Sequence, residues 1–146
     1  MGLAPDQRAF LEAHRSAAMV TLRRDGTPHA VQVGVAVVDG ALWSSGTAGR
    51  ARTRHLRRDP RATLFVFDGR RSYLTLEAVV TILDGPDAAE QNLRLFQVMQ
   101  GRSGSDPLAW YGGELSPSEF LKAMEAEGRL IYEFEVVRAY GWLPSS

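Results

Sequence analysis

The chain has 146 residues, of which 45% are hydrophobic, and its 17 lysines and arginines balance 17 aspartates and glutamates. This length suits one domain with a sizeable core, so we expect residues 1–146 to form a single domain. Proteins that coat nucleic acid or an anionic membrane usually carry a basic excess, so the balanced charge argues against both kinds of partner.

Several kinds of site are excluded or disfavoured by residue content. The chain has no cysteine, which excludes disulfides, thiolate nucleophiles and cysteine-ligated metal centres. Its three histidines lack the short spacings of a metal site, and no HExxH motif occurs, so no metal site is predicted. The N-terminal segment lacks the apolar run of a signal peptide, and no stretch approaches the roughly 20 apolar residues of a membrane-spanning helix. These patterns predict a cytoplasmic protein.

The first half of the chain is predicted to be an antiparallel meander. Three Asp-Gly pairs, at 25–26, 39–40 and 68–69, separate apolar runs and are typical of tight hairpin turns. Closure of such a meander into a barrel removes the exposed strand edges. The predicted elements are a helix over 5–14, strands over 17–23, 29–38 and 41–44, a helix that begins near residue 48, and strands over 62–67 and 72–83.

The second half changes character. The spacing of apolar residues predicts a helix over 86–100, and a Gly/Ser/Pro-rich loop is expected over 101–115. The Ser-Pro-Ser-Glu sequence at 116–119 is typical of a helix start, and Gly128 would end that helix. Alternation over 129–137 predicts a last strand that returns to the barrel. The fold class expected is therefore mainly β, a barrel with helices.

The most informative stretch is LWSSGTAGRARTRHLRRDPR, residues 42–61. It leaves a strand through small hydroxyl and glycine residues and then enters a segment that contains five arginines before Asp59. A helix that begins near Ala48 would direct free backbone N–H groups and its positive dipole end toward a ligand above the Ser-Gly-Thr turn. Arg50 and Arg52 would lie in its first turn, where each guanidinium can bind two oxygens of a phosphate or carboxylate. These features predict an anion cradle for a phosphorylated cofactor.

Other interpretations of this stretch remain open. Arginines along a helix usually form a solvated face, and Asp59-Pro60 is an ordinary helix stop. The hydroxyl-rich turn favours anion binding, because a solvated helix does not need two serines, a threonine and two glycines before its arginines. Ser44 and Ser45 lack the GxSxG surroundings of a nucleophile, so a capping or ligand-binding role is favoured.

The strand expected over 29–38 carries four valines on one face, and its other face is small and polar. Gln32 belongs to the small, polar face, and both His29 and Gln32 lie on the strand that hairpins into the strand over 41–44. A glutamine there could form hydrogen bonds with a planar heterocycle, although a solvated outer face is the alternative. No catalytic residue is assigned, so a bound cofactor would have to carry any redox reaction.

Four segments of the chain resemble the pyridoxamine-phosphate-oxidase-like split-barrel superfamily. They are most similar to its actinobacterial branch, which uses the deazaflavin coenzyme F420. The resemblance covers about residues 13–142 in the same order and is most specific at GRARTRHLRRDPRA. The four segments are TLRRDGTPHAVQV, GRARTRHLRRDPRATLFV, SYLTLEAVVTIL and RLIYEFEVVRAYGW.

This resemblance implies a homodimer of six-stranded antiparallel split barrels with two cofactor sites in the interface grooves. The implied activity is hydride transfer from reduced F420 to a conjugated small molecule, such as a quinone, an enone or a biliverdin-like compound. His29 and Gln32 would approach the cofactor ring. The residues implied to hold the phosphate or acidic tail are Ser44, Ser45, Gly46, Arg50, Arg52 and Thr53.

Two positions depart from the family pattern. The second basic residue of the Arg-x-Lys pair is Arg52, which keeps the charge but changes the geometry. Arg71 stands where relatives often carry an aromatic residue, so a stacking wall is missing or is supplied by Trp110. The alternatives are an FMN-dependent oxidase or reductase of the same fold, and a non-catalytic protein that binds a flavin, a deazaflavin or a tetrapyrrole. The five arginines favour F420, whose tail is longer and more acidic than the phosphate of FMN.

Overall fold

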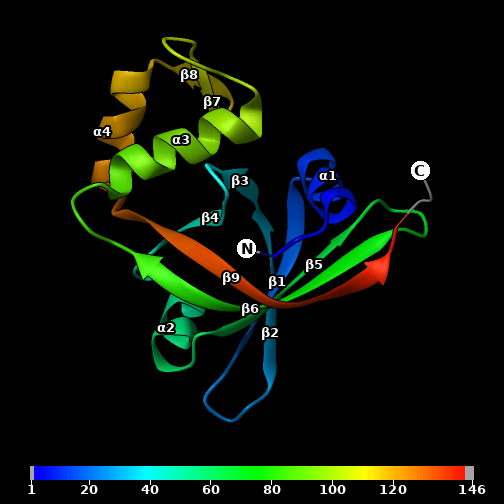
Figure 1. Ribbon diagram of the computed structural model, residues 1–146. Helices are drawn as coiled ribbons and strands as arrows, with labels where there is room; N and C mark the ends of the chain where they lie inside the picture. Colours follow the sequence, from blue (N-terminus) through cyan, green and yellow to red (C-terminus); the bar gives the residue numbers. More distant parts are fainter. Residues whose placement is uncertain (1, 144–146) are drawn as a thin grey trace.

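A computed structural model describes residues 2–143, and its main feature is a strongly curled antiparallel sheet (Figure 1). Residues 1 and 144–146 of the expected domain lie outside the described part. The strands of the main sheet are β1 (Ser16–Leu22), β2 (Pro28–Gly34), β3 (Ala36–Val38), β4 (Ala41–Thr47), β5 (Arg61–Phe67), β6 (Tyr73–Leu83) and β9 (Arg129–Trp142). The helices are α1 (Pro5–Ala13), α2 (Ala51–Arg58), α3 (Ala88–Gln100) and α4 (Pro117–Glu127), and a separate hairpin contains β7 (Leu108–Trp110) and β8 (Gly113–Leu115).

The main sheet has the strand order β2-β1-β5-β6-β9-β4-β3 and forms a half-barrel. Its two outermost strands, β2 and β3, follow each other in the chain and are separated only by Val35. The Val35 amide donates a 2.7 Å hydrogen bond to the Arg15 carbonyl, and at this point the chain changes its pairing partner from β1 to β4. The prediction of six strands is therefore wrong for residues 2–143, because the single strand expected over 29–38 is two strands.

The three Asp-Gly pairs do form hairpin turns, as the sequence predicts. Asp39 and Gly40 both have positive φ, 48° and 84°, and they join β3 to β4 directly. Such a two-residue turn matches the twist of the flanking strands. Asp25 accepts hydrogen bonds from the Thr27 amide and hydroxyl at 3.0 and 2.6 Å, which holds the first hairpin closed.

The last strand is the centre of the architecture. β9 pairs with β6 along one side and with β4 along the other, so it joins the two halves of the sheet. It runs to Trp142, five residues beyond its predicted end at Val137, because β6 continues to offer hydrogen bonds there. A bulge between Glu77 and Ala78 shifts the register and lets this long pair bend.

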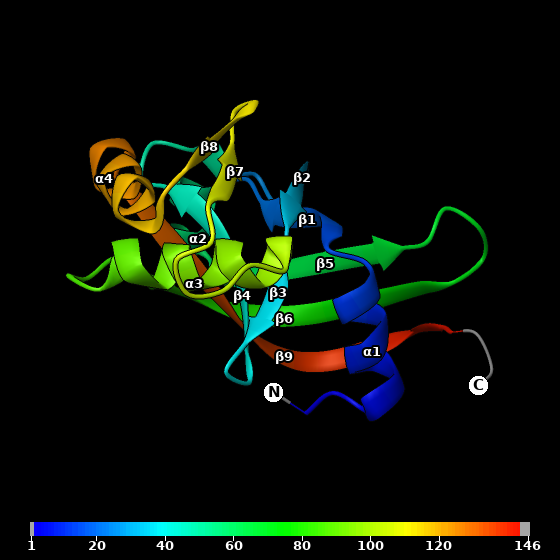
Figure 2. The ribbon, with the colours of Figure 1, turned by 90° about the horizontal axis from the view of Figure 1, so that it is seen from above.

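Three apolar clusters fill the structure. The largest lies inside the curl of the sheet, where α1 adds Phe10 and Leu11 to residues such as Leu64 and Leu76. A second lies between the sheet and α3, and a third joins α3, α4 and the β7–β8 hairpin. The hairpin falls in the segment expected to be a loop, so that prediction was wrong. In Figures 1 and 2, α3, α4 and the hairpin gather at one end of the curled sheet, and Figure 1 shows α2 apart from them.

None of the helices in residues 2–143 is long and apolar enough to cross a membrane. One face of the sheet remains without cover, on β5, β6 and β9. Its large apolar side chains are 36–65% exposed, which is unusual for so many neighbours on one surface. They are Phe65, Phe67, Val79, Val137, Tyr140 and Trp142.

Candidate functional site

The six residues predicted to bind an anionic tail lie at the end of β4 and the beginning of α2. α2 begins at Ala51, later than the predicted start near Ala48, and Arg50 is its N-cap residue rather than a member of its first turn. The backbone amide of Arg50 donates to the Thr47 carbonyl at 3.3 Å. The Arg50 side chain is exposed, and within residues 2–143 it has neither a hydrogen bond nor an ion pair.

Arg52 is held differently. Its guanidinium lies 5.6 Å from the centroid of the Tyr132 ring, and its Nη2 donates to the Ser45 carbonyl at 3.3 Å. Its Nε is buried and has no hydrogen-bond partner in the described residues. Burial lowers the pKa of this guanidinium, and neighbouring Arg50 adds to the effect, but an arginine stays charged in a protein. A half-buried cation without a carboxylate beside it is an incomplete arrangement that an anion would complete.

Tyr132 of β9 lies beneath this cradle and is fully buried. Its hydroxyl forms a short hydrogen bond with Thr53 Oγ1, and Thr53 in turn donates to the Thr47 carbonyl at 2.7 Å. Gly46 lies against the phenol ring so closely that a Cβ atom at this position would overlap it. Gly46 and Thr53 therefore contact Tyr132 on the buried side of the cradle, and direct contacts with a ligand would come from other residues.

The two predicted serines also have structural partners. Ser44 is buried, and its hydroxyl donates to the Gly34 carbonyl at 2.7 Å, which joins β4 to the end of β2. Ser45 is half-buried, and its hydroxyl donates to Oδ1 of Asn92 on α3. Asn92 is itself fully buried and donates to the carbonyls of Ala88 at 2.9 Å and Leu130 at 3.4 Å. Asn92 thus fixes the floor of the cradle to α3.

His29 lies beside α2 rather than beside the Ser-Gly-Thr turn at residues 45–47, which we call the cradle turn. Its ring packs edge-on against His55 of α2, with ring centroids 5.0 Å apart, and its buried Nδ1 has no hydrogen-bond partner in the described residues. His55 Nδ1 is bonded to the Thr21 hydroxyl at 2.9 Å. Desolvation lowers the pKa of His55, and nearby His29 and Arg58 lower it further. No three potential metal ligands gather at one place within residues 2–143.

Gln32 is exposed on β2 and lines a different hollow. This groove has a volume of 610 Å³ and is walled by small residues, including Ala18 and Ala30, with Phe67 at one side. No residue of the cradle lines it. A groove with small walls and one amide is suited to a planar ring. Of the eight predicted site residues, only Gln32 lines this groove.

Trp110, one of the two alternatives for the stacking wall, belongs to the β7–β8 hairpin. Its indole packs against Phe96 at a centroid distance of 5.2 Å, and the guanidinium of Arg129 lies 5.2 Å from its ring centroid. Arg129 is the register partner of Thr47 in the sheet, so the hairpin lies close to the cradle turn. Beside Trp110 there is a hollow of 570 Å³, lined also by Tyr111 and Gln100.

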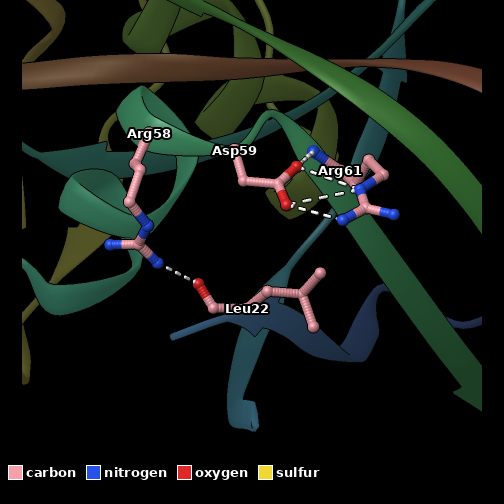
Figure 3. A network of polar contacts seen from close by, with 4 residues as sticks. All are labelled: Leu22, Arg58, Asp59 and Arg61. Carbon is pink, nitrogen blue, oxygen red and sulfur yellow. Dashed lines mark hydrogen bonds and ion pairs between the residues drawn. The ribbon is translucent and has the colours of Figure 1, made fainter. Parts of the chain in front are cut away.

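The arginines at and just beyond the C-terminal end of α2 already have hydrogen-bond or ion-pair partners, as Figure 3 shows for Arg58 and Arg61. Arg58 donates to the Leu22 carbonyl at 2.5 Å, and Arg61 forms an ion pair with Asp59 at 2.8 Å. Arg57 pairs with Asp84 at 3.0 Å. Arg54 is likewise bonded, to the Gly49 carbonyl at 2.6 Å. Of the five arginines expected around the cradle, Arg50 has no side-chain partner within residues 2–143, and Arg52 keeps an unpaired Nε beside its one bond to the Ser45 carbonyl.

Two polar atoms are buried without a partner among the described side chains, and they are Arg52 Nε and His29 Nδ1. Both belong to residues that the sequence assigned to a cofactor. Because buried polar atoms are almost always hydrogen-bonded in folded proteins, these two mark places where a further group fits. In the cradle itself, the exposed Arg50 guanidinium and the unpaired Arg52 Nε are donors suited to an anionic group such as a phosphate.

Three residues that shape the site were not found from the sequence. The sequence pattern predicts only the elements to which they belong, which are a strand for Tyr132, a helix for Asn92 and the basic segment for His55. A buried tyrosine or asparagine has no distinctive sequence spacing, so its partner from a distant element remains hidden. Asn92 lies four residues after Ala88, on the face of α3 that turns toward the sheet, and its polarity on that face was the one available signal.

Comparisons with known proteins agree with this architecture. The conserved hypothetical protein Rv2991 from Mycobacterium tuberculosis is 20% identical, with a TM-score of 0.76 over 97% of this chain and 85% of its own. A structure named F420 reductase is 19% identical, with a TM-score of 0.63 over 91% of this chain and 94% of its own. General Stress Protein 26 from Bacillus anthracis is 12% identical, with a TM-score of 0.64 over 93% of this chain and 92% of its own.

A search of curated proteins finds no significant match. The model of the family described as "Pyridoxamine 5'-phosphate oxidase", in contrast, matches residues 3–142, which is nearly the whole chain. Together with the half-barrel and the basic segment after β4, this match means that the chain belongs to the pyridoxamine 5'-phosphate oxidase family.

Proposed function

We propose that this protein is an oxidoreductase that binds reduced coenzyme F420 and directs its hydride to a conjugated organic acceptor. The observation that carries the proposal is the half-buried guanidinium of Arg52, which within residues 2–143 has an unpaired Nε and no carboxylate partner and lies next to Arg50, whose side chain is also unpaired there. Such a pair at the beginning of a helix is suited to a phosphate group. The F420 reductase among the similar structures supports the choice of cofactor.

Each part of the site then has a task. Arg50 and Arg52 bind the phosphate and the acidic tail, and the Ser45 backbone and the first turn of α2 orient them. His29 offers an unpaired ring nitrogen, and Gln32 offers an amide in the groove with small walls. Reduced F420, when bound, supplies the hydride. The protein's own contribution is to hold the ring in one orientation and to keep bulk water from it.

A homodimer in the cytoplasm is part of the proposal. The exposed apolar face of β5, β6 and β9 is suited to a second copy, because its aromatic side chains would otherwise remain in water. Phe65 lies 5.4 Å from Phe67 and 5.6 Å from Tyr73 by ring centroid, so the face is already a packed aromatic surface. Size-exclusion chromatography with light scattering measures this directly: a monomer at micromolar concentration would contradict the dimer.

The hollow beside Trp110 is our candidate for the acceptor. Its aromatic lining and its volume of 570 Å³ suit a planar conjugated molecule, and Arg129 connects its wall to the cradle turn. Quinones, enones and biliverdin-like compounds have this chemistry. Turnover is measured as oxidation of reduced F420, without oxygen, in the presence of each acceptor class.

The first test is a pair of titrations, with F420 and with FMN, followed by tryptophan quenching at low and high salt. We expect micromolar or tighter binding of F420, much weaker binding of FMN and a loss of affinity as salt rises, because the contacts are charged. Preference for FMN would support the FMN-dependent alternative instead. Tight binding of F420 without turnover of any acceptor would favour a storage or sensing protein. Binding of neither would overturn the proposal.

A further inference from the structure

We infer that Tyr132 is the positioning residue of the anion cradle: its ring sets the orientation of Arg52, and its hydroxyl fixes the first turn of α2 through Thr53. The inference rests on the proposed function, because an orientation of Arg52 matters only if Arg52 binds an anion. Tyrosine is an unexpected residue at position 132. Tyr132 is fully buried in the largest apolar cluster, where phenylalanine would fill nearly the same space without a polar group to satisfy.

The direction of the hydrogen bonds shows what the hydroxyl does. Thr53 has one hydroxyl proton, and it is directed at the Thr47 carbonyl at 2.7 Å. In the short contact between Thr53 Oγ1 and the Tyr132 hydroxyl, tyrosine must therefore be the donor. The result is a chain of donors from β9 through α2 to the end of β4. This chain fastens the helix start to the turn that precedes it, on the side away from solvent.

The ring of Tyr132 has a second task. The Arg52 guanidinium lies 5.6 Å from its centroid, and an arginine is attracted to an aromatic face through both its charge and its flat shape. Gly46 makes room for the phenol, because any larger residue at that position would overlap it. The ring thus leaves Arg52 with a restricted orientation while its Nε remains without a partner.

The contact with the ring depends on the residue type at position 52, which is arginine. An ammonium group is a compact charge that cannot lie flat on an aromatic ring, whereas a guanidinium can. The orientation of the cation therefore depends on both Arg52 and Tyr132, and a positive charge at position 52 alone is not sufficient for it.

The test uses the full chain and three conservative changes: Tyr132→Phe, which keeps the ring, Thr53→Val, which keeps the shape, and Arg52→Lys, which keeps the charge. The dissociation constants of F420 and FMN are measured, together with thermal unfolding without ligand. We expect each change to weaken binding of the preferred cofactor by about five- to tenfold at a temperature where every variant is folded. The double change Tyr132→Phe/Thr53→Val is expected to match Thr53→Val alone within about twofold, because both remove one chain of hydrogen bonds.

The outcomes separate this inference from the proposed function. If the unchanged protein binds neither F420 nor FMN, the proposed function fails and the inference fails with it. If the unchanged protein binds a cofactor and Tyr132→Phe and Thr53→Val lower only the unfolding temperature, Tyr132 has a merely structural role and the inference alone is overturned. Full affinity in Arg52→Lys would likewise overturn it, since the ring would then not orient the cation.

Discussion

The two ends of α2 carry the same residue type in opposite states. At the C-terminal end, Arg57 and Arg58 are bonded to Asp84 and to the Leu22 carbonyl, and Arg61 just beyond is bonded to Asp59. At the N-terminal end, Arg50 has no side-chain partner in the described residues and Arg52 lies on an aromatic ring. The positions of acceptors, rather than the number of arginines, therefore decide which guanidinium groups stay without partners within residues 2–143.

The two ends also differ in their relation to the helix dipole. Cations near the C-terminus of a helix interact favourably with its partial negative charge, whereas cations near the N-terminus do not. The arginines at the C-terminal end therefore stabilise the fold modestly. Those at the N-terminal end lie beside a partial positive charge, and a bound anion would offset this unfavourable interaction. Ligand binding and stability should thus be separable by mutation.

The largest effect is expected from the residue that shapes the N-terminal end. Gly46→Ala places a Cβ atom into the Tyr132 phenol, and overpacking of this kind costs about 1–3 kcal/mol or more. We expect a fall of several degrees in the unfolding temperature, measured by circular dichroism, and loss of cofactor binding. Gly49→Ala is the matched control, because nothing lies within 4 Å of a Cβ there. Equal unfolding temperatures for the two variants would contradict the close packing of Gly46 on Tyr132.

The next effect separates the two ends directly. Arg50→Ala removes an exposed cation without a partner, so we expect about tenfold weaker cofactor binding and an unchanged unfolding temperature. Arg58→Ala removes a cation of the same helix that is bonded to the Leu22 carbonyl, and its cofactor affinity should stay within about twofold of the original. Isothermal titration of both variants measures this. A similar loss of affinity in both would mean that general positive charge, and not the cradle, binds the ligand.

The smallest effect lies at the C-terminal end and depends on pH. Hydrogen bonds from Arg61 lower the pKa of Asp59 to about 2, below the value of about 3.9 in an unfolded chain. The ionised form is thus favoured in the folded state, so its contribution to stability is present above about pH 4 and is lost as the pH falls toward 2. Because Arg61 is exposed, solvent screens this pair and we expect it to contribute little to the free energy of unfolding.

Asp59→Asn tests this by urea unfolding between pH 5 and pH 2 (~0.5 unit steps). The variant should lose less stability than the original protein over this range. Its cofactor affinity at neutral pH should be unchanged, because Asp59 lies at the end of α2 that does not bind the anion. An equal pH dependence in both proteins would show that the pair with Arg61 does not form in solution.

Much of the fold could be predicted because its turns are local. Each Asp-Gly pair determines its own backbone geometry, so all three hairpins appear where the sequence places them. The division of the expected strand into β2 and β3 at Val35 could not be predicted, because the alternation of valines continues through this position. The division arises because the chain changes its pairing partner there from β1 to β4. The β7–β8 hairpin was missed because its turn contains Tyr111, with φ of 49°, rather than the usual asparagine or aspartate.

The candidate site was predictable to a similar degree. The cradle arginines and hydroxyl residues are contiguous in the chain, so one stretch of sequence contained them. Tyr132 is 79 residues away from its partner Thr53, and Asn92 is 47 residues away from Ser45. Which arginines are neutralised depends on carbonyl and carboxylate positions set by the whole fold, as at Leu22 and Asp84.

The position of β9 has a consequence for how the protein is made. Because this strand pairs with both β6 and β4, those two strands each lack one neighbour until residues 129–142 have been synthesised. A nascent chain that has emerged only through α4 presents two open strand edges, which are sites for aggregation. Since Tyr132 belongs to β9, the cradle is also incomplete at that stage. Any binding at the proposed cradle would therefore have to follow insertion of the last strand, and a chaperone that protects the emerging chain would act before that step.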